Sequence, residues 1–217
     1  MTLVLIGMSA IMAVVVGWLL RQTRATQPWI EQRAAVPPAA APASSALKAG
    51  LGVFLTVATA FFALFISAYF MRREGADWRP IEVPALLWFN TLVLILASVC
   101  FQSARARSGQ EQGLRRSLLA GVLLSWMFLA GQLLAWQQLQ ADGYSLRANP
   151  ANAFFYVLTA LHGLHLLGGL WVWATTMFKL RLGGNSAALR LRVELCTIYW
   201  HFLLLVWLVL FALLAGT

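Results

Sequence analysis

The stretch AFFYVLTALHGLHLLGGLWVWATTMF, residues 153–178, carries no charged side chain along its whole length. A bilayer core about 30 Å thick is crossed by about 20 helical residues, so this stretch is long enough to span it. Its apolar residues run continuously instead of alternating with a period of two, which favours a helix over a barrel strand. Five other continuously apolar runs are of similar length: residues 3–20, 49–71, 84–101, 118–138 and 194–215, the last with Glu194 at its start. The sequence therefore predicts an all-α, polytopic membrane bundle of six transmembrane helices.

The composition agrees with a membrane protein. Of the 217 residues, 61% are hydrophobic and 11% are charged, whereas soluble domains average about 45–50% apolar and 25% charged residues. The net charge of +9 comes from basic residues between the apolar runs, as expected for loops that face an anionic membrane surface, so we do not expect nucleic-acid binding. Cys100 and Cys196 each stand alone, which favours structural thiols over a zinc or iron–sulfur centre.

Three segments are expected along the chain: an N-terminal transmembrane helix at 1–21, a linker rich in Pro and Ala at 22–48, and a five-helix domain at 49–217. The loops that follow the first, third and fifth predicted helices contain twelve Lys and Arg, and the other connections contain four. Because basic residues accumulate on the cytoplasmic side, these three loops are predicted to be cytoplasmic, with both termini on the outer side.

The acidic residues fall in loops or at a helix end. They are Glu31, Glu74, Asp77, Glu82, Glu111, Asp142 and Glu194. Proton pumps and ion-coupled transporters usually place ionisable side chains inside their spans. The pattern therefore disfavours an independent pump or a carboxylate-driven transporter.

The polar side chains predicted at membrane depth are Asn90, Gln132, Thr159, His162, His165 and His201. At 100° per residue, His162, His165 and Gly169 lie near one stripe of the fifth predicted helix, and His201 lies at a similar depth in the sixth. These histidines could hold a haem between the two helices, as in a small b-type cytochrome. They could instead form hydrogen bonds across a helix interface, where glycines allow close approach. With three histidines in the whole chain, we favour metal-free helix contacts.

The amides and the aromatic residues have structural interpretations. A lone amide in a membrane helix, such as Gln132 or Asn90, usually bonds a neighbouring helix. Aromatic side chains near predicted interfaces are expected to anchor helix ends in lipid. These are Trp78, Trp88, Trp136 and Tyr144.

Four stretches in order resemble cytochrome c oxidase subunit III and the wider subunit III family of haem-copper oxidases. They are ADWRPIEVPALLWFNTLVLILASVCFQSARAR (residues 76–107), FLAGQLLAWQQL (128–139), FFYVLTALHGLHLLGGLWVW (154–173) and YWHFLLLVWLVLF (199–211). The third is similar to the family's F-Y-x-x-T-G-x-H-G-x-H-x-x-x-G helix and the fourth to its Y-W-H-F-V-D-x-V-W-L-x-L-F ending. The resemblance covers about residues 50 to 214 and implies the five-helix bacterial form of the subunit.

The resemblance implies an accessory, non-catalytic subunit of a haem-copper terminal oxidase in a bacterial inner membrane. Haem and copper would belong to the partner subunit I, and no cofactor or metal is expected in this chain. The expected partners are subunit I, subunit II and phospholipids. The accessory subunit of a nitric oxide reductase, from the same superfamily, is the alternative function.

Three positions depart from the family pattern by replacing a carboxylate with an apolar residue. Ala58 stands at the position of the family's intramembrane acid in the second predicted helix. The stretch FLAGQLLAWQQL resembles the family's F-L-x-x-Q-x-x-E-Y segment, and Ala135 and Trp136 stand at its E-Y pair. Leu203 and Leu204 stand at the V-D pair of the fourth stretch. In the family these acids are associated with proton uptake by the partner subunit. Because these acids are missing, we expect the chain to have a structural and assembly role rather than a role in proton uptake.

Overall fold

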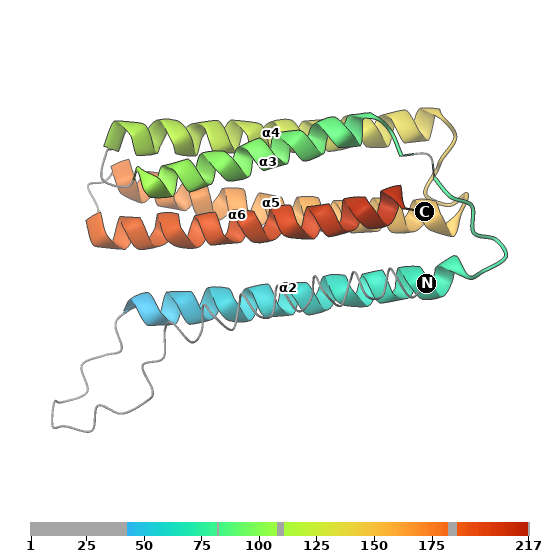
Figure 1. The fold of residues 1–217 in the computed structure, drawn as a ribbon, viewed down its shortest axis with the longest axis horizontal. Coiled ribbons are helices and arrows are strands. Elements are labelled where there is room, and N and C mark those ends of the chain that lie inside the picture. The colour runs from blue at the N-terminus through green and yellow to red at the C-terminus, as the bar shows by residue number, and fades with distance from the viewer. Residues whose placement is uncertain (1–42, 82, 108–110, 182–185, 217) are drawn as a thin grey trace, which may run out of the picture. The chain divides into compact units, whose positions relative to one another are not determined.

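The computed structural model describes residues 43–81, 83–107, 111–181 and 186–216. Within these ranges every regular element is an α-helix (Figure 1). The helices are α2 (Ala43–Arg73), α3 (Leu86–Ala106), α4 (Glu111–Ala141), α5 (Pro150–Arg181) and α6 (Ser186–Ala215). Each contains a segment long and apolar enough to cross a membrane. The all-α prediction and the last five predicted spans are therefore confirmed, whereas the predicted first helix lies outside the described residues.

The start of α2 differs from the sequence prediction. The linker was expected to continue to residue 48, but α2 begins at Ala43. The residues from 43 to 48 follow Pro42 in the sequence, and helices commonly begin just after a proline. Residues 22–42 of the predicted linker lie outside the described residues.

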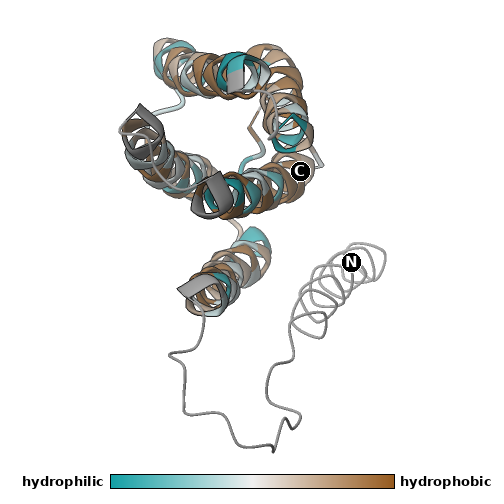
Figure 2. Ribbon diagram, turned by 90° about the vertical axis from the view of Figure 1, so that its left-hand side faces the viewer, coloured by the Kyte–Doolittle hydropathy of each residue, from teal (hydrophilic) through white to brown (hydrophobic). Residues whose placement is uncertain are grey.

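The chain divides into two compact units, residues 1–57 and 58–217, and the division falls inside α2. In the second unit, α3 packs against α4 and α6, and α5 packs against α6 and α4. These four helices therefore form a closed ring, which Figure 2 shows from its end. Their apolar side chains both fill the centre and cover the outside, because lipid accepts such side chains as readily as the protein interior does.

Aromatic side chains fill the centre of the four-helix ring. Trp200 and Trp207 of α6 are fully buried. The Trp200 ring lies 4.1 Å from the Phe101 ring of α3, and the Trp207 ring lies 4.8 Å from the Phe128 ring of α4. Large side chains also face outward: 74% of Trp171 is exposed. Such faces suit contact with lipid or another subunit.

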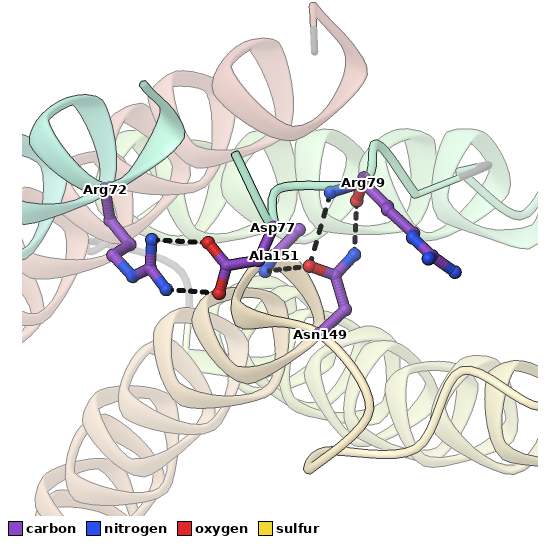
Figure 3. Close-up of polar contacts among 5 residues, drawn as sticks. All are labelled: Arg72, Asp77, Arg79, Asn149 and Ala151. Atoms are coloured by element: carbon purple, nitrogen blue, oxygen red, sulfur yellow. Dashed lines mark hydrogen bonds and ion pairs between the residues drawn. The ribbon is translucent and has the colours of Figure 1, made fainter. Parts of the chain in front are cut away.

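Asn149 fixes the start of α5 and the connection between α2 and α3 (Figure 3). Its Oδ1 accepts hydrogen bonds from the backbone N–H groups of Ala151 (3.2 Å) and Arg79 (3.3 Å), and its Nδ2 donates to the Arg79 carbonyl. Asn at the N-cap followed by Pro150 is a favoured start for a helix.

Nearby, Arg72 forms a two-bond ion pair with Asp77 at 2.5 and 2.8 Å and lowers the pKa of that carboxyl group.

Replacing Asn149 should loosen this end of the bundle. Asn149→Ala removes all three hydrogen bonds, and loss of a helix cap alone costs about 0.5–2 kcal/mol. Asn149→Asp retains the accepting oxygen but cannot donate to the Arg79 carbonyl, so we expect a loss of stability between those of wild type and Asn149→Ala. Thermal unfolding of the purified complex measures the order of the three proteins. Equal midpoints for the Ala and Asp variants would contradict the role of the Nδ2 donor.

Candidate functional site

The candidate site is the polar interior of the ring formed by α3, α4, α5 and α6. Asn90 of α3, Gln132 of α4 and His162 of α5 are 1%, 4% and 0% exposed. Thr159 is also buried, and its hydroxyl donates to the Phe155 carbonyl at 2.7 Å and accepts from the Trp136 indole at 3.1 Å. These four polar side chains are therefore buried inside the bundle, whereas His165 of α5 is only partly covered.

His162 is held between aromatic rings. Its imidazole lies 5.2 Å from the Trp207 ring of α6 and 5.7 Å from the Phe128 ring of α4. Neither of its ring nitrogens has a hydrogen-bond partner among the described residues. His162 therefore touches two other helices through its ring faces and edges.

Gly169 and the backbone carbonyl of His165 lie on the side of α5 that meets α6, whereas the His165 ring lies 5.2 Å from the Phe62 ring of α2. The His165 Nδ1–H donates to the Leu161 carbonyl of its own helix at 2.8 Å, and the His165 backbone carbonyl accepts a hydrogen bond from the Tyr199 hydroxyl at 2.7 Å. A Cβ atom on Gly169 would lie 2.7 Å from Tyr199 Cε1 and 3.0 Å from the Trp200 ring. The absence of a side chain at Gly169 is therefore what lets the aromatic rings of α6 approach α5.

His201 turns toward α3 instead of toward His165. Its Nε2–H donates to Gln102 Oε1 at 3.1 Å, and its Nδ1 accepts from the Ser98 hydroxyl at 2.5 Å. We assign the ring proton of neutral His201 to Nε2 because Gln102 Oε1 can only accept a hydrogen bond. Both ring nitrogens are then used, so His201 has no free lone pair for a haem iron. The sequence placed His165 and His201 at a similar depth, but the structure uses them at different interfaces.

Three further hydrogen bonds join α6 to its neighbours through residues that the sequence did not single out as partners. Trp207 Nε1 donates to the Thr91 hydroxyl at 2.9 Å, Trp200 Nε1 to the Ser125 hydroxyl at 3.0 Å, and the Thr197 hydroxyl lies 3.2 Å from the Phe101 carbonyl. The hydroxyl of a Ser or Thr in a helix commonly bonds a backbone carbonyl of the same helix. A Ser or Thr in the sequence therefore does not predict a hydrogen bond to another helix.

Removing the Ser98 hydroxyl should weaken the contact between α3 and α6. Ser98→Ala leaves His201 Nδ1 without its donor in a half-buried position, and such a loss costs about 1–3 kcal/mol. We expect a lower thermal midpoint for the complex and a smaller change for Ser103→Ala, the same substitution elsewhere on α3. Equal changes for the two variants would show that the Ser98 to His201 bond contributes nothing.

The predicted interface residues have unequal environments. Trp88 is 64% exposed, and its ring packs edge-on against Phe211 at 4.7 Å. Trp78 is partly covered and contacts the Tyr69 ring at 4.9 Å. Trp136 and Tyr144 instead bond inside the bundle, the first to Thr159 and the second through its carbonyl to the Tyr156 hydroxyl.

The positions that replace family carboxylates are mostly interior. Ala58 is 3% exposed and Ala135 is 0% exposed. Leu203 is buried as well, whereas Leu204 is only partly covered. An acid at either of these two positions would therefore be buried in this fold. Within the part of the chain that the structure describes, no three His, Cys, Asp or Glu side chains gather where they could hold a metal ion.

Residues 1–215 match the family model for cytochrome c oxidase subunit III. This chain belongs to the cytochrome c oxidase subunit III family. Cytochrome c oxidase subunit 3 of Thermostichus vulcanus is 31% identical over 172 residues, which cover 76% of this chain and 84% of the relative. That of Synechocystis sp. is 31% identical, covering 76% and 72%. The probable subunit 3 of Nocardia farcinica is 29% identical, covering 76% and 85%.

As a member of the subunit III family, the chain is an accessory, non-catalytic subunit of a haem-copper oxidase complex in a membrane. Its family membership favours this function over a nitric oxide reductase subunit or a small b-type cytochrome. Two expectations drawn from the four ordered stretches are therefore confirmed, the membership of the subunit III family and the accessory, non-catalytic role.

Proposed function

We propose that the chain is a scaffold for subunit I of a bacterial haem-copper oxidase, which it contacts together with subunit II. The observation that carries this proposal is the interior of the ring of helices α3–α6. Buried rings and hydrogen bonds to side chains on neighbouring helices join α6 to α3 and α4. Ala58 and Ala135 are buried, and we infer that they stand where the resemblance to the family predicts acids that support proton uptake. The interior is therefore suited to holding a fixed shape rather than to carrying protons.

The chain would lie in the inner membrane of a bacterium, because the named relatives come from bacteria. From the excess of basic residues we infer that the α3–α4 and α5–α6 connections would face the cytoplasm and that both termini would lie on the outer side. We expect phospholipids as further partners. The support is a set of outward apolar side chains on α2, including Leu64 at 70% and Phe61 at 40% exposure.

We further propose that the chain holds no redox cofactor of its own. The polar and small residues of the predicted site would instead form contacts between helices; they are Asn90, Gln132, Thr159, His162, His165, Gly169 and His201. His201 supports this assignment because both of its ring nitrogens bond side chains of α3. Haem and copper would then be held by subunit I.

Gentle purification through a tag on this chain tests the function. We expect a large haem protein to copurify and to account for the optical spectrum of the preparation. The chain separated from its partner should be colourless. Absence of a large haem protein would overturn the scaffold function. A Soret band in the isolated chain that disappears in His165→Ala or His201→Ala would establish a cytochrome instead.

A further inference from the structure

Three buried side chains in the ring of helices α3–α6 have both of their polar atoms unpaired. In the described ranges, Asn90, Gln132 and His162 have no hydrogen-bond partner for either side-chain oxygen or nitrogen. All three are at least 96% buried, since their exposed fractions are 1%, 4% and 0%. The other described side chains with a buried unpaired polar atom have one such atom each; they are Trp78, Asn152 and Trp173.

The three side chains come from three helices and meet the same turn of α4. A Cβ atom built on Gly131 would lie 2.9 Å from Asn90 Cγ, so the Asn90 amide rests against α4 at that point. The His162 ring contacts the Phe128 ring at 5.7 Å. Phe128 and Gln132 are four residues apart and therefore lie on one face of α4. Asn90 and His162 thus approach α4 within one turn of Gln132.

Trp207 of α6 confirms that this is one level of the bundle. Its indole donates to Thr91, the neighbour of Asn90, at 2.9 Å. Its ring also lies 5.2 Å from the His162 ring. One side chain of α6 therefore touches α3 and α5 at the same height. The unpaired groups are gathered in a single layer, which we call the polar layer and which consists of Asn90, Gln132 and His162.

Leaving these groups unpaired would be costly. A buried polar group without a partner costs about 1–3 kcal/mol, and the polar layer contains six such atoms. Each amide offers an acceptor and a donor group, and a neutral imidazole offers one of each. Water can donate two hydrogen bonds and accept two, and it can bridge groups that are too far apart to bond directly. Buried water typically makes about three such bonds.

We propose that the polar layer is an internal hydration site, at which Asn90, Gln132 and His162 bind at least one ordered water molecule. The water would join α3, α4 and α5 by hydrogen bonds at a level where direct bonds between their side chains are missing. A neutral ligand fits the site because all three groups are uncharged when His162 is neutral. The surrounding Phe128 and Trp207 rings exclude bulk solvent and leave the bonds in a low-dielectric environment.

Cryo-electron microscopy of the assembled oxidase, at a resolution that shows ordered water, tests the proposal. We expect a density peak within hydrogen-bond distance of Gln132 and of at least one of Asn90 and His162. The peak should be lost in Gln132→Leu and retained in Gln137→Leu, the same change at an exposed position of α4. Direct pairing of the three side chains without a peak would overturn the proposal. Density for a larger molecule would overturn it too.

X-ray footprinting in ¹⁸O-labelled water gives a second test that needs no variant. Radiolysis of bound water labels the side chains beside it, so Phe128 and Trp207 should be labelled several-fold more than Phe101 and Phe155. All four are almost fully buried, with exposed fractions of 0–1%, so bulk solvent reaches none of them preferentially. Equal labelling of the two pairs would contradict an internal hydration site, even if Gln132→Leu fails to assemble.

Discussion

Gly169→Ala should lower the stability of the complex, whereas Gly168→Ala on the neighbouring residue should not. The new methyl group at Gly169 would lie 2.7 Å from Tyr199 Cε1 and 3.0 Å from Trp200, closer than carbon atoms normally approach. The Trp200 ring cannot move aside easily, because it packs 4.1 Å from the Phe101 ring and bonds Ser125. Overpacking of this kind costs about 1–3 kcal/mol.

Gly168 is a matched control because a Cβ atom there would meet nothing within 4 Å. Both substitutions replace Gly by Ala in the same turn of α5, so any gain in helix propensity is shared. The difference between the two thermal midpoints therefore measures the clash alone. Gly169→Leu should give a larger loss, with less of the chain retained in the purified complex. A midpoint for Gly169→Ala equal to that of Gly168→Ala would disprove the close contact between α5 and α6.

The helices themselves could be predicted from the sequence, because a chain in lipid must satisfy its backbone hydrogen bonds internally. The predicted spans nevertheless underestimated helix length. Helix α4 begins at Glu111 instead of residue 118, and α6 begins at Ser186 instead of residue 194. The apolar runs mark the part of a helix inside the hydrocarbon, whereas the hydrogen-bonded backbone continues through the polar headgroup region.

The similar level of His165 and His201 along the bundle could be predicted, but the direction of their side chains could not. Counting along the fifth and sixth spans placed His165 and His201 near one level, and the Tyr199 hydroxyl does bond the His165 carbonyl. His201 nevertheless faces Ser98 of α3. Since a helix surrounded by lipid can be apolar on every side, its sequence lacks the one-sided pattern that fixes rotation in a soluble bundle.

The glycines illustrate the same limit. Gly163, Gly168 and Gly169 all lie in the fifth predicted helix, and glycines at its interface were expected to allow close helix approach. A Cβ atom would clash at Gly169, reach ordinary contact with Leu129 at 3.6 Å from Gly163, and meet nothing near Gly168. Which glycine is needed depends on where the large rings of the neighbouring helix fall, and that is a property of the packed pair.

Trp207→Ala should cause the largest loss of stability among the variants considered. Trp207 is fully buried and contacts three helices through the Phe128 ring, the His162 ring and the Thr91 hydroxyl. An apolar side chain is as well accommodated by lipid as by the interior of the bundle. The loss of stability in Trp207→Ala therefore comes from the cavity that the substitution leaves and from the contacts that it breaks. Truncation of a buried Trp to Ala costs about 3–5 kcal/mol. We expect poor assembly and a markedly lower thermal midpoint.

Two companion variants separate the causes of this loss. Trp207→Phe retains much of the ring packing but removes the indole N–H that donates to Thr91 at 2.9 Å, so it should cost less than Trp207→Ala. Trp171→Ala removes the same atoms from a side chain that is 74% exposed and should leave the bundle stable, because lipid can fill the space. Equal losses of stability for Trp171→Ala and Trp207→Ala in the isolated subunit would contradict this explanation. The contacts of Trp207 with Thr91, Phe128 and His162 would then not be what holds α3, α4 and α5 against α6.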